Sequence, residues 1–477
     1  MRHLYSLLLT VVAVLLLPWV FYRSLFRKRS IRNLRERLGL RPFQASADRE
    51  RPELLGQRTV WLHAVSVGEV QAARPLCRQL RQVDPALRLV VTTTTDTGQK
   101  MARQMIPEAD LVGYFPLDWA GAVRRVLRAV RPSLVILMES ELWYNFLLEC
   151  ETHQIPVLVA NGRISDRTYR RAGRFRRWTG QLYGRVTLFA MQSVADRDRV
   201  VRLGAPFDRV HVTGNLKYDP VEQEGGTGPA GGQAGGQAGD EDSSRLGQFL
   251  TSGHGGVSRR PMIVAGSTHP GEEAILLDAY QQLRTRLSTL PQEDLMPRLL
   301  IAPRHPERFA EVARLMASTG RALRRRSESQ ASAADPDLLL LDSIGELAKV
   351  YRWATIVLIG GSLVPIGGHN LLEPATLSRP VIVGPHMENF REIVEVFRRE
   401  KAVLQLIKGD PAELARSLAT TWERLLLDTE EAQLLGRRAR EVVEANRGAT
   451  ARTVVLGMSL LAGSSPSKPA LARGRAR

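Results

Sequence analysis

The feature that most constrains the fold is an alternation of short apolar runs with longer helical patterns. Between about residues 58 and 220 the β-branched runs are TVWLHAV, LRLVVTTTT, LVILM, VLVANG and VTLFAMQ, and segments with helical spacing separate them. Strands that are apolar on both faces and are joined by helices are typical of a parallel sheet covered on both sides. This stretch therefore predicts a doubly wound α/β domain.

The same alternation returns after residue 258, with the runs PMIVAGS, RLLIAPR, LLLLDS, TIVLIGGS and RPVIVG. Between the two halves, residues 224–257 form a Gly/Ala/Gln-rich tract that is too polar and too rich in glycine to pack. We therefore expect two Rossmann-like domains that face a central cleft. This is the GT-B glycosyltransferase architecture, which some epimerases and phosphorylases share, so the fold alone does not choose a function.

The length of 477 residues is too great for one hydrophobic core, and changes in composition suggest where the chain divides. The predicted segments are a membrane anchor with a basic juxtamembrane helix (1–42), an N-terminal Rossmann-like domain (43–222), a low-complexity linker (223–258), a C-terminal Rossmann-like domain (259–463) and a disordered tail (464–477).

The N-terminus predicts attachment to a membrane. Residues 4–22 contain no charged side chain and are long enough to cross a bilayer as a helix. A cleaved signal peptide is the alternative, but its apolar core would be shorter and would end in small residues, whereas residues 19–22 are WVFY. Residues 23–41 are rich in Arg and Lys and hold one acid, Glu36. The positive-inside rule then places the rest of the protein on the cytoplasmic side of the membrane, with the basic segment against its lipid headgroups.

The net charge of +18 indicates an anionic partner, which could be nucleic acid, a membrane surface or a phosphorylated substrate. The chain has no RRM, KH or zinc-finger signature, so we expect no nucleic-acid partner. Only Cys77 and Cys150 occur, which excludes a disulfide framework and favours a reducing compartment. No His or Cys spacing is typical of a metal site, and the acidic triplets lie in unsuitable contexts, so we expect no metal.

Ligands of open α/β sheets bind at the carboxyl ends of the strands, so the residues that follow each apolar run are the candidates. In the second half, small residues at helix starts and an arginine at a strand end favour phosphate binding. For any one of them, ordinary helix capping or a surface ion pair is the alternative, and their convergence at three strand ends supports the ligand interpretation. These candidates are Ser267 and Thr268, Pro303 and Arg304, and Ile344, Gly345 and Glu346.

A glycine-rich segment, GGSLVPIGGHNLLEPATLSRPVIVG, begins at Gly360. Its glycines allow a ligand to approach the backbone closely, and His369, Asn370 and Glu373 then gather polar groups at the start of a helix. Glu373 is suited to bonding a ribose diol, although a helix-start charge is the alternative. No G-x-G-x-x-G motif follows a strand, so we expect a sugar nucleotide and no dinucleotide cofactor.

In the first half, three charged residues follow strands. Glu69 comes soon after VWLHAVSVG, but Ser66-x-x-Glu69 is also a capping box, and we expect capping and catalysis to exclude each other in one side-chain conformation. Glu139 directly follows LVILM, whereas Glu141 suits a helix-start carboxylate better. Lys217 lies at another strand end, with a solvated surface lysine as the alternative.

Eight segments in order, WLHAVSVGEVQAARPL, TTTTDTGQKMA, MESELW, NGRIS, GNLKYD, AGSTHPGEE, APRHPERF and GGSLVPIGGHNLLEPA, closely resemble the bacterial 3-deoxy-D-manno-octulosonic acid (Kdo) transferases. The resemblance runs from the apolar N-terminus to about residue 400. It implies an inverting, metal-independent GT-B glycosyltransferase of lipopolysaccharide core biosynthesis that needs no cofactor. Such an enzyme moves Kdo from CMP-Kdo to the lipid A precursor, a tetra-acyl disaccharide 1,4′-bisphosphate.

By this resemblance, Glu69 matches the catalytic base of the family, and Glu139 and Lys217 match residues that support the transition state. The N-terminal domain would then take the acceptor and the C-terminal domain the nucleotide. Two departures concern loops: Tyr144 stands where the family commonly has Pro, and the tract at 224–257 is longer than usual. The segments that match the CMP site are Pro303 and Arg304; Ile344, Gly345 and Glu346; and Asn370, Leu371, Leu372 and Glu373, with Ser267, Thr268 and His369 as further donor or phosphate candidates.

Two expectations about mechanism follow. Glu69 would take the proton of the acceptor hydroxyl, and the positive end of its helix would keep it ionised. Arg170, Arg171 and Arg174, interleaved with aromatic residues, would form a face for the acceptor or the membrane, although a solvated basic helix is the alternative. The rival functions are a UDP-sugar transferase or epimerase and a membrane-tethered nucleic-acid binder.

Overall fold

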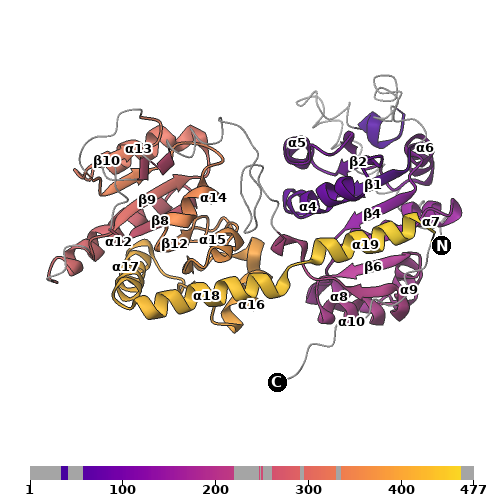
Figure 1. Ribbon diagram of the computed structural model, residues 1–477. Helices are drawn as coiled ribbons and strands as arrows, with labels where there is room; N and C mark the ends of the chain where they lie inside the picture. Colours follow the sequence, from indigo (N-terminus) through magenta and orange to yellow (C-terminus); the bar gives the residue numbers. More distant parts are fainter. Residues whose placement is uncertain are drawn as a thin grey trace. The chain divides into compact units, whose positions relative to one another are not determined.

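The computed structural model describes residues 34–40, 57–219, 246–247, 249–250, 260–290, 295–328 and 335–463 (Figure 1). The chain divides into two compact units, one formed by residues 1–221 with 446–477 and the other by residues 222–445. The predicted anchor at residues 4–22 and the predicted tail at 464–477 lie outside the described residues. Within the described residues, no helix combines the length and the hydrophobicity that crossing a membrane requires.

The first unit is built on a parallel sheet of seven described strands in the order β3-β2-β1-β4-β5-β6-β7. The strands are β1 Thr59–His63, β2 Arg88–Thr93, β3 Leu111–Tyr114, β4 Leu134–Met138, β5 Val157–Gly162, β6 Leu188–Met191 and β7 Val210–Val212. The helical elements are α4 Val67–Val83, α5 Asp96–Met105, α6 Ala120–Val130, α7 Tyr144–Thr152, α8 Asp166–Gly173, α9 Arg176–Tyr183, α10 Val194–Arg202, the short turns η2 Phe207–Arg209 and η3 Leu216–Tyr218, and α19 Ala449–Leu461.

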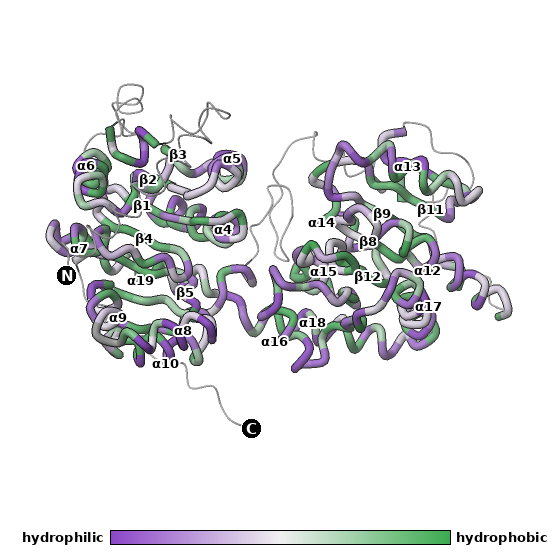
Figure 2. The backbone as a smooth tube through the Cα atoms, turned by 180° about the vertical axis from the view of Figure 1, so that it is seen from behind, coloured by the Kyte–Doolittle hydropathy of each residue, from purple (hydrophilic) through white to green (hydrophobic). Residues whose placement is uncertain are grey.

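Helices cover both faces of this sheet. Residues of α4, α5 and α19 pack with one set of strand side chains, and residues of α6, α7 and α10 pack with the other. Every residue of β1, β2, β4 and β5 is buried, as the apolar runs predicted, and these strands stand out as hydrophobic segments in Figure 2. The prediction of a doubly wound domain is confirmed for this unit.

The second unit repeats the design with seven described parallel strands in the order β10-β11-β9-β8-β12-β13-β14. The strands are β8 Met262–Thr268, β9 Arg298–Pro303, β10 Leu323–Arg325, β11 Leu338–Leu340, β12 Ile356–Ile359, β13 Val381–Val383 and β14 Leu404–Gln405. The helical elements are α12 Glu272–Leu287, η5 Pro306–Arg308, α13 Phe309–Ala317, α14 Leu347–Val350, η6 Tyr351–Trp353, α15 Leu372–Thr376, η7 Glu388–Phe390, α16 Arg391–Arg399, α17 Pro411–Leu427 and α18 Thr429–Asn446.

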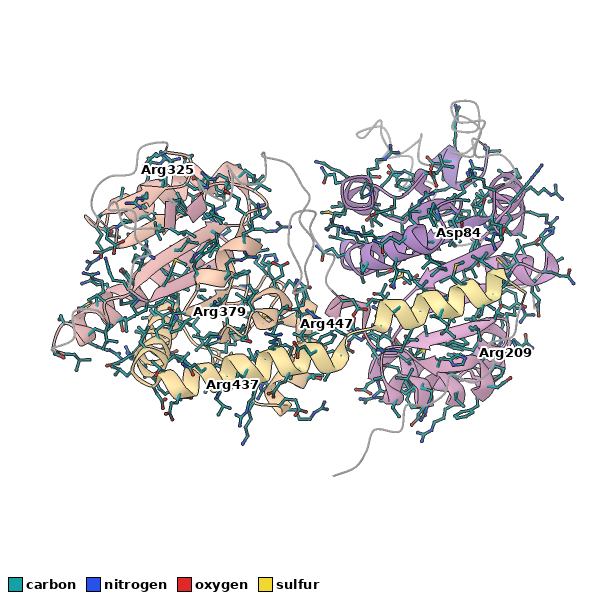
Figure 3. All side chains as sticks on the ribbon, in the orientation of Figure 1. Asp84, Arg209, Arg325, Arg379, Arg437 and Arg447 are labelled. Atoms are coloured by element: carbon teal, nitrogen blue, oxygen red, sulfur yellow. The ribbon has the colours of Figure 1, made fainter. Side chains whose placement is uncertain are left out.

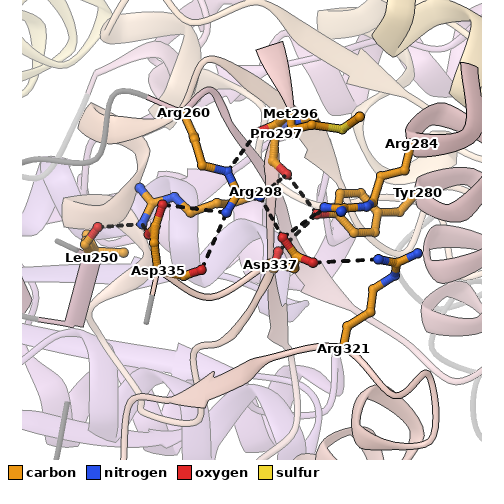
Figure 4. Close-up of polar contacts among 10 residues, drawn as sticks. All are labelled: Leu250, Arg260, Tyr280, Arg284, Met296, Pro297, Arg298, Arg321, Asp335 and Asp337. Atoms are coloured by element: carbon orange, nitrogen blue, oxygen red, sulfur yellow. Dashed lines mark hydrogen bonds and ion pairs between the residues drawn. The ribbon is translucent and has the colours of Figure 1, made fainter. Parts of the chain in front are cut away.

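A polar network closes the amino ends of the strands in the second unit (Figure 4). The carboxylate of Asp337 pairs with Arg260 at 2.7 Å and with Arg284 at 2.8 Å, and Arg321 lies 3.6 Å from its other oxygen. Burial opposes ionisation here, but the two nearer arginines lower the pKa of Asp337. Because ligands of such sheets bind at the opposite, carboxyl ends of the strands, this network stabilises the fold and leaves the site edge free.

The observed division of the chain differs from the predicted one at its C-terminal end. α19 was predicted to belong to the second domain, but it packs on α4, β4 and β6 of the first unit. Asp219 fixes the start of this helix, because its two carboxylate oxygens accept the N–H groups of Gly448 at 2.7 Å and Thr450 at 2.6 Å. Apolar periodicity predicts that a helix is covered, and it does not say which sheet covers it.

Part of the predicted low-complexity linker is packed. Leu246, Phe249 and Leu250 are buried, and the carbonyls of Phe249 and Leu250 accept hydrogen bonds from Arg324 at 3.2 Å and Arg298 at 2.7 Å. The three apolar side chains follow the glycine-rich tract, and their burial makes this stretch part of the second unit.

Residues 34–40, predicted as part of the basic juxtamembrane segment, pack on the first unit. The guanidinium of Arg37 donates to the carbonyl of Thr94 at 2.5 Å and lies 5.6 Å from the centre of the Tyr114 ring. Arg125 donates to the carbonyl of Leu38 at 2.6 Å. Arg37 therefore contacts residues of the first unit, whereas the sequence analysis had predicted that it faces lipid headgroups.

Candidate functional site

The first unit has its topological switch point between β1 and β4, where the strand order reverses and open α/β sheets bind ligands. β1 leads into α4, whose first turn carries Glu69, and β4 leads directly to Glu139. The two predicted acids thus follow the two strands that flank the switch point. Their charges are close enough that each influences the local electrostatics, because Glu139 raises the pKa of Glu69.

Glu69 is held in a capping geometry. Its Oε2 accepts the backbone N–H of Val65 at 2.8 Å, and its Oε1 accepts the hydroxyl of Ser66 at 3.0 Å. Ser66 is the N-cap of α4 and also accepts the backbone N–H of Glu69 at 3.4 Å. The capping motif predicted from the sequence is therefore present, with the N–H of Val65 in the place expected for that of Ser66.

Burial raises the pKa of Glu69 to about 7, and the charges of Glu139 and Glu141 add to the rise. The hydrogen bonds from Val65 and Ser66 act in the opposite direction and do not cancel it. The expectation that Glu69 is fully ionised at neutral pH was wrong, because only 7% of the residue is exposed and desolvation raises its pKa to about 7. A carboxyl group that titrates near neutral pH is well matched to accepting a proton.

Glu139 occupies a strained backbone position at the end of β4. Its φ of 57° lies in the left-handed region, which costs a non-glycine residue free energy and is common at functional sites. Its N–H pairs with the carbonyl of Ala160 in β5, so the neighbouring strand holds the turn. The side chain is half-buried.

Glu141 adds a third acid that the site prediction set aside as a helix-start residue. α7 begins only at Tyr144, with Trp143 as its N-cap, so Glu141 does not lie in that helix. Burial, then the charge of Glu139, raise the pKa of Glu141. The signal in the sequence was the pair of acids in MESELW directly after a buried strand.

Lys217 lies in η3, which follows the last strand of the first sheet and contacts α4. Two asparagines shape this turn: Oδ1 of Asn215 accepts the N–H of Lys217, and Oδ1 of Asn161 accepts the N–H of Leu216, both at 3.0 Å. Asn161 is fully buried at the end of β5 and has a φ of 55°. The sequence analysis missed Asn161, although NGRIS was one of the segments that carried the resemblance.

The second unit has its switch point between β8 and β12, and two histidines meet there. His269 follows β8 and His369 lies in the loop after β12, with 2.8 Å between their Nε2 atoms. The ring of His305, which follows β9, stands edge-on to His269 with ring centres 5.1 Å apart. Burial lowers the pKa of His269, and burial with the charge of neighbouring groups lowers that of His369 to about 4. The prediction named His369 but assigned no role to the other two.

Ser267 and Thr268, both predicted to contact phosphate, differ in whether their side chains are accessible. Thr268 is fully buried and its hydroxyl donates to Oε1 of Glu273 at 2.8 Å, so this hydroxyl serves the interior. Ser267 is half-buried and has a φ of 61°, which marks a second strained residue at a strand end. Thr268 is corrected to a structural role because its side-chain partner is a carboxylate of the same unit.

The glycine-rich loop at residues 360–363 binds a carboxylate of the protein itself. Glu272 is 1% exposed and accepts the N–H groups of Gly361 at 2.6 Å, Ser362 at 3.0 Å and Leu363 at 2.8 Å. It also accepts the N–H of His269 at 2.9 Å. These donors form the kind of backbone concavity that binds anions, and Glu272 fills it.

The remaining CMP candidates lie near the same sheet edge. Arg304 is exposed, and within the described ranges its side chain has no ion pair. Ile344 and Gly345 are exposed, but Glu346 is buried against Arg326, with 2.8 Å between Oε1 and Nη2. Asn370 accepts the N–H of Leu372 on Oδ1 and donates to Glu373, while the side chains of Leu371 and Leu372 are buried.

The sequence is similar to a described protein family and to named proteins. Residues 32–220 match the family described as 3-deoxy-D-manno-octulosonic-acid transferase (kdotransferase). The chain is 33% identical to the 3-deoxy-D-manno-octulosonic acid transferase of Haemophilus influenzae over 455 residues, which are 95% of this chain and 97% of that protein. The corresponding transferase of Bordetella pertussis is 32% identical over 83% of this chain and 86% of that protein. The chain belongs to the 3-deoxy-D-manno-octulosonic acid transferases.

This Kdo transferase, a glycosyltransferase, also resembles solved structures in its fold. The UDP-GlcNAc 2-epimerase of Neisseria meningitidis matches with a TM-score of 0.53 and 13% identity, over 83% of this chain and 99% of that one. At that identity the likeness concerns the fold alone. The resemblance noted from the sequence motifs is confirmed by the family.

The basic face predicted for the acceptor or the membrane lies at α8 of the transferase. Arg170, Arg171 and Arg174 are exposed, and the structure gives them no ion pair among the residues it describes. Phe175 is 65% exposed and Trp178 is 38% exposed beside them. Exposed aromatic and basic side chains together suit a lipid surface. In the same described ranges, no three His, Cys, Asp or Glu side chains are grouped so that they could hold a metal ion.

Proposed function

We propose that this Kdo transferase moves Kdo from CMP-Kdo to the lipid A precursor, with Glu69 as the general base. The observation that carries the proposal is a buried carboxyl group with a pKa of about 7 at the switch point of the first sheet. An acceptor hydroxyl is a poor nucleophile, and a base within hydrogen-bond reach contributes about 10² to 10⁴ in rate.

The capping contacts leave Glu69 able to act. A carboxylate offers about four lone-pair positions on its two oxygens, and Val65 and Ser66 use one on each. The same side-chain conformation can therefore cap α4 and accept a proton, contrary to the exclusion expected from the sequence. The two hydrogen bonds orient the carboxylate, which is what a base needs if it is to meet a hydroxyl in one geometry.

In the proposed reaction, the acceptor oxygen bonds to the anomeric carbon of Kdo as the bond from that carbon to the phosphate oxygen of CMP breaks. The proton of the hydroxyl passes to Glu69, and the electron pair of the broken bond leaves with CMP. A cation near the donor stabilises the charge that develops on the leaving phosphate. We assign this role to Lys217, with Glu139 as a further group that supports the transition state.

The donor would bind at the carboxyl ends of β8, β9, β11 and β12. Arg304 supplies an exposed cation there, Ile344 and Gly345 supply an exposed backbone segment, and the amide of Asn370 is placed by Leu372. Pro303 and Glu346 shape the two segments from their buried positions. No cofactor or metal has a part in this proposal.

The acceptor is an acylated bisphosphate, so the enzyme must work at a lipid surface. We place it on the cytoplasmic face of the inner membrane, attached through residues 4–22. The exposed arginines at 170, 171 and 174 would meet acceptor phosphates or anionic headgroups. Residues 34–40, which connect to the apolar segment, dock beside Thr94 and Tyr114 at the carboxyl ends of β2 and β3. This is the edge of the sheet that carries Glu69.

The test is incubation with CMP-Kdo and tetra-acylated lipid A precursor, followed by the mass of the product. We expect a mass increase of one or more Kdo units and release of CMP. Competition then separates the rival donor, because CMP and not UDP should inhibit. A product formed from a UDP-sugar, or the absence of any transfer from CMP-Kdo, would reject the proposal.

A further inference from the structure

The four backbone donors around Glu272 link the two halves of the switch point in the second unit. Glu272 opens α12, immediately after β8, whereas Gly361, Ser362 and Leu363 belong to the loop that follows β12. The carboxylate therefore joins the ends of two adjacent strands through hydrogen bonds of 2.6 to 3.0 Å. The sequence suggested that a ligand approaches the backbone of this glycine-rich segment, yet an internal carboxylate binds its N–H groups.

A continuous set of contacts leads from Glu272 to the histidine pair. Glu272 accepts the N–H of Gly361, and the carbonyl of Gly361 accepts the N–H of Gly368 at 2.8 Å. His369 follows directly, and its Nε2 lies 2.8 Å from Nε2 of His269. His269 closes the ring, because its own backbone N–H donates to Glu272 at 2.9 Å.

Gly361 also sets the space that the two imidazoles occupy. Its φ is 66°, and a Cβ at this position would lie 3.1 Å from Cδ2 of His369 and 3.4 Å from Cδ2 of His269. The loop thus forms the wall against which both rings rest. A shift of the loop would change the distance between the rings.

The hydrogen bond between the rings restricts their protonation. An Nε2-to-Nε2 contact at 2.8 Å needs one ring to donate its N–H and the other to accept it on Nε2, so at least the accepting imidazole is neutral. Arg304 is exposed nearby, and its charge lowers the pKa of both rings. Two imidazoles in a fixed relative position beside a guanidinium form a surface suited to an anionic group.

We propose that Glu272 is a positioning residue for the donor: its carboxylate fixes the 361–363 loop, and through that loop it fixes the His269–His369 pair on which, with Arg304, an anionic group of the donor binds. This inference rests on the proposed function, because it takes CMP-Kdo as the donor. Glu272 itself is buried and does not touch the donor.

The test compares Glu272→Gln with Glu273→Gln. Both glutamates lie in the first turn of α12 and each is 1% exposed. Glu273 pairs with Arg308 at 2.6 Å and with Thr268, and it does not contact the loop. Both variants weaken the contacts of a buried carboxylate, with backbone N–H groups for Glu272 and with Arg308 for Glu273, so both should lower the melting temperature. Only Glu272→Gln turns an amide NH₂ toward the loop's N–H groups and so loosens the loop.

Three readouts are measured on the full-length enzyme: melting temperature, KM and kcat with CMP-Kdo, and the ¹⁵N–¹⁵N coupling across the hydrogen bond between the rings in enzyme labelled with ¹⁵N-histidine. For Glu272→Gln we expect the coupling to disappear and KM for CMP-Kdo to rise about tenfold, which corresponds to the loss of one good contact, with a smaller change in kcat. Glu273→Gln should keep both the coupling and the KM.

Gly361→Ala disturbs the pair while the Glu272 side chain is unchanged, since its methyl group would crowd the ring of His369 at 3.1 Å and the φ of 66° would strain the loop. It should reproduce the loss of coupling and the rise in KM. The inference is overturned if Glu272→Gln keeps the coupling, or if its KM rises no more than that of Glu273→Gln. The coupling is measured without donor, so the two proposals can fail separately. If the unaltered enzyme does not use CMP-Kdo, the proposed function is rejected. The coupling in Glu272→Gln still decides whether Glu272 positions the histidines.

Discussion

The carboxylate of Glu69 accepts the backbone N–H of Val65, with 2.8 Å between Oε2 and the nitrogen. Val65 ends the segment that follows β1, so this hydrogen bond ties the proposed base to the strand end and to the start of α4 at once. Burial raises the pKa of the same group to about 7. A residue that a sequence pattern would assign to helix capping therefore also has the electrostatics of a base.

Replacing Glu69 by Gln should abolish transfer while the protein stays folded. The amide cannot take a proton, so we expect kcat to fall by about 10² to 10⁴. Loss of the cap should cost about 1 kcal/mol of unfolding free energy. Binding of CMP, followed by calorimetry, should not change.

A matched control is Glu413→Gln in α17 of the second unit. Glu413 completes a capping box with Asp410, in which Asp410 N–H donates to Glu413 at 2.9 Å. This variant should lose a similar amount of stability and keep full activity. If the two variants had equal activity, Glu69 would be a cap and nothing more.

The pH dependence of transfer should follow the titration of Glu69. A base must be deprotonated, so kcat/KM should rise as the pH increases through about 7. Ser66→Ala removes a hydrogen bond that favours the charged form, and it should move this rise to higher pH. A profile that is flat across neutral pH would contradict the assignment.

The free energy of unfolding should also depend on the titration of Glu69, but it should fall as the pH rises, whereas the activity should increase. The pKa of Glu69 is raised from 4.5 to about 7 on folding, so the folded state holds the proton more tightly than the unfolded state. Its contribution to the unfolding free energy is full below about pH 4.5 and is lost as the pH rises through about 7. Denaturant melts of the unaltered enzyme and of Glu69→Gln across this range should show the difference between them shrinking as the pH rises.

Lys217→Met should reduce kcat with little effect on CMP affinity. Removing a group that stabilises developing charge typically costs about 10² to 10³ in kcat. Lys100→Met, an exposed lysine on α5 of the same unit, is the control for loss of one positive charge. Rapid-quench assays at saturating donor distinguish the two, and equal rates in both variants would remove Lys217 from the mechanism.

Much of the fold could be predicted from the sequence because buried parallel strands appear in it as apolar runs. The residues that follow these runs lie at the edge of the sheet where ligands bind. Glu69, Glu139 and Lys217 were chosen as candidates in this way, and the structure places all three at the carboxyl side of one sheet. What the sequence could not supply was the partner of each polar group. Thr268, Glu272 and Glu346 stand at strand ends like the others, yet their side chains bind groups of their own unit.

Three further features that the sequence did not predict have the same physical origin. Desolvation depends on what surrounds a side chain, so the helix start at Glu69 suggested a fully ionised group, whereas burial raises its pKa to about 7. The docking of α19 on the first sheet depends on which surface is left open, and local periodicity carries no such information. The histidine pair joins residues 100 positions apart, and no local pattern relates them.

Charge reversal at Arg170, Arg171 and Arg174 tests the proposed acceptor face. Each basic residue near an anionic lipid surface contributes about 1 kcal/mol, so three reversals should raise KM for acceptor in anionic vesicles by at least about a hundredfold. The control carries the same change of net charge on the second unit, with Arg314, Arg416 and Arg437 each replaced by Glu; all three are exposed, and Arg437 is labelled on α18 in Figure 3. Because net charge is equal in the two triple variants, a general electrostatic effect would weaken both alike. A selective loss in the first variant, which added salt reduces toward the level of the control, would locate the acceptor or its membrane at α8.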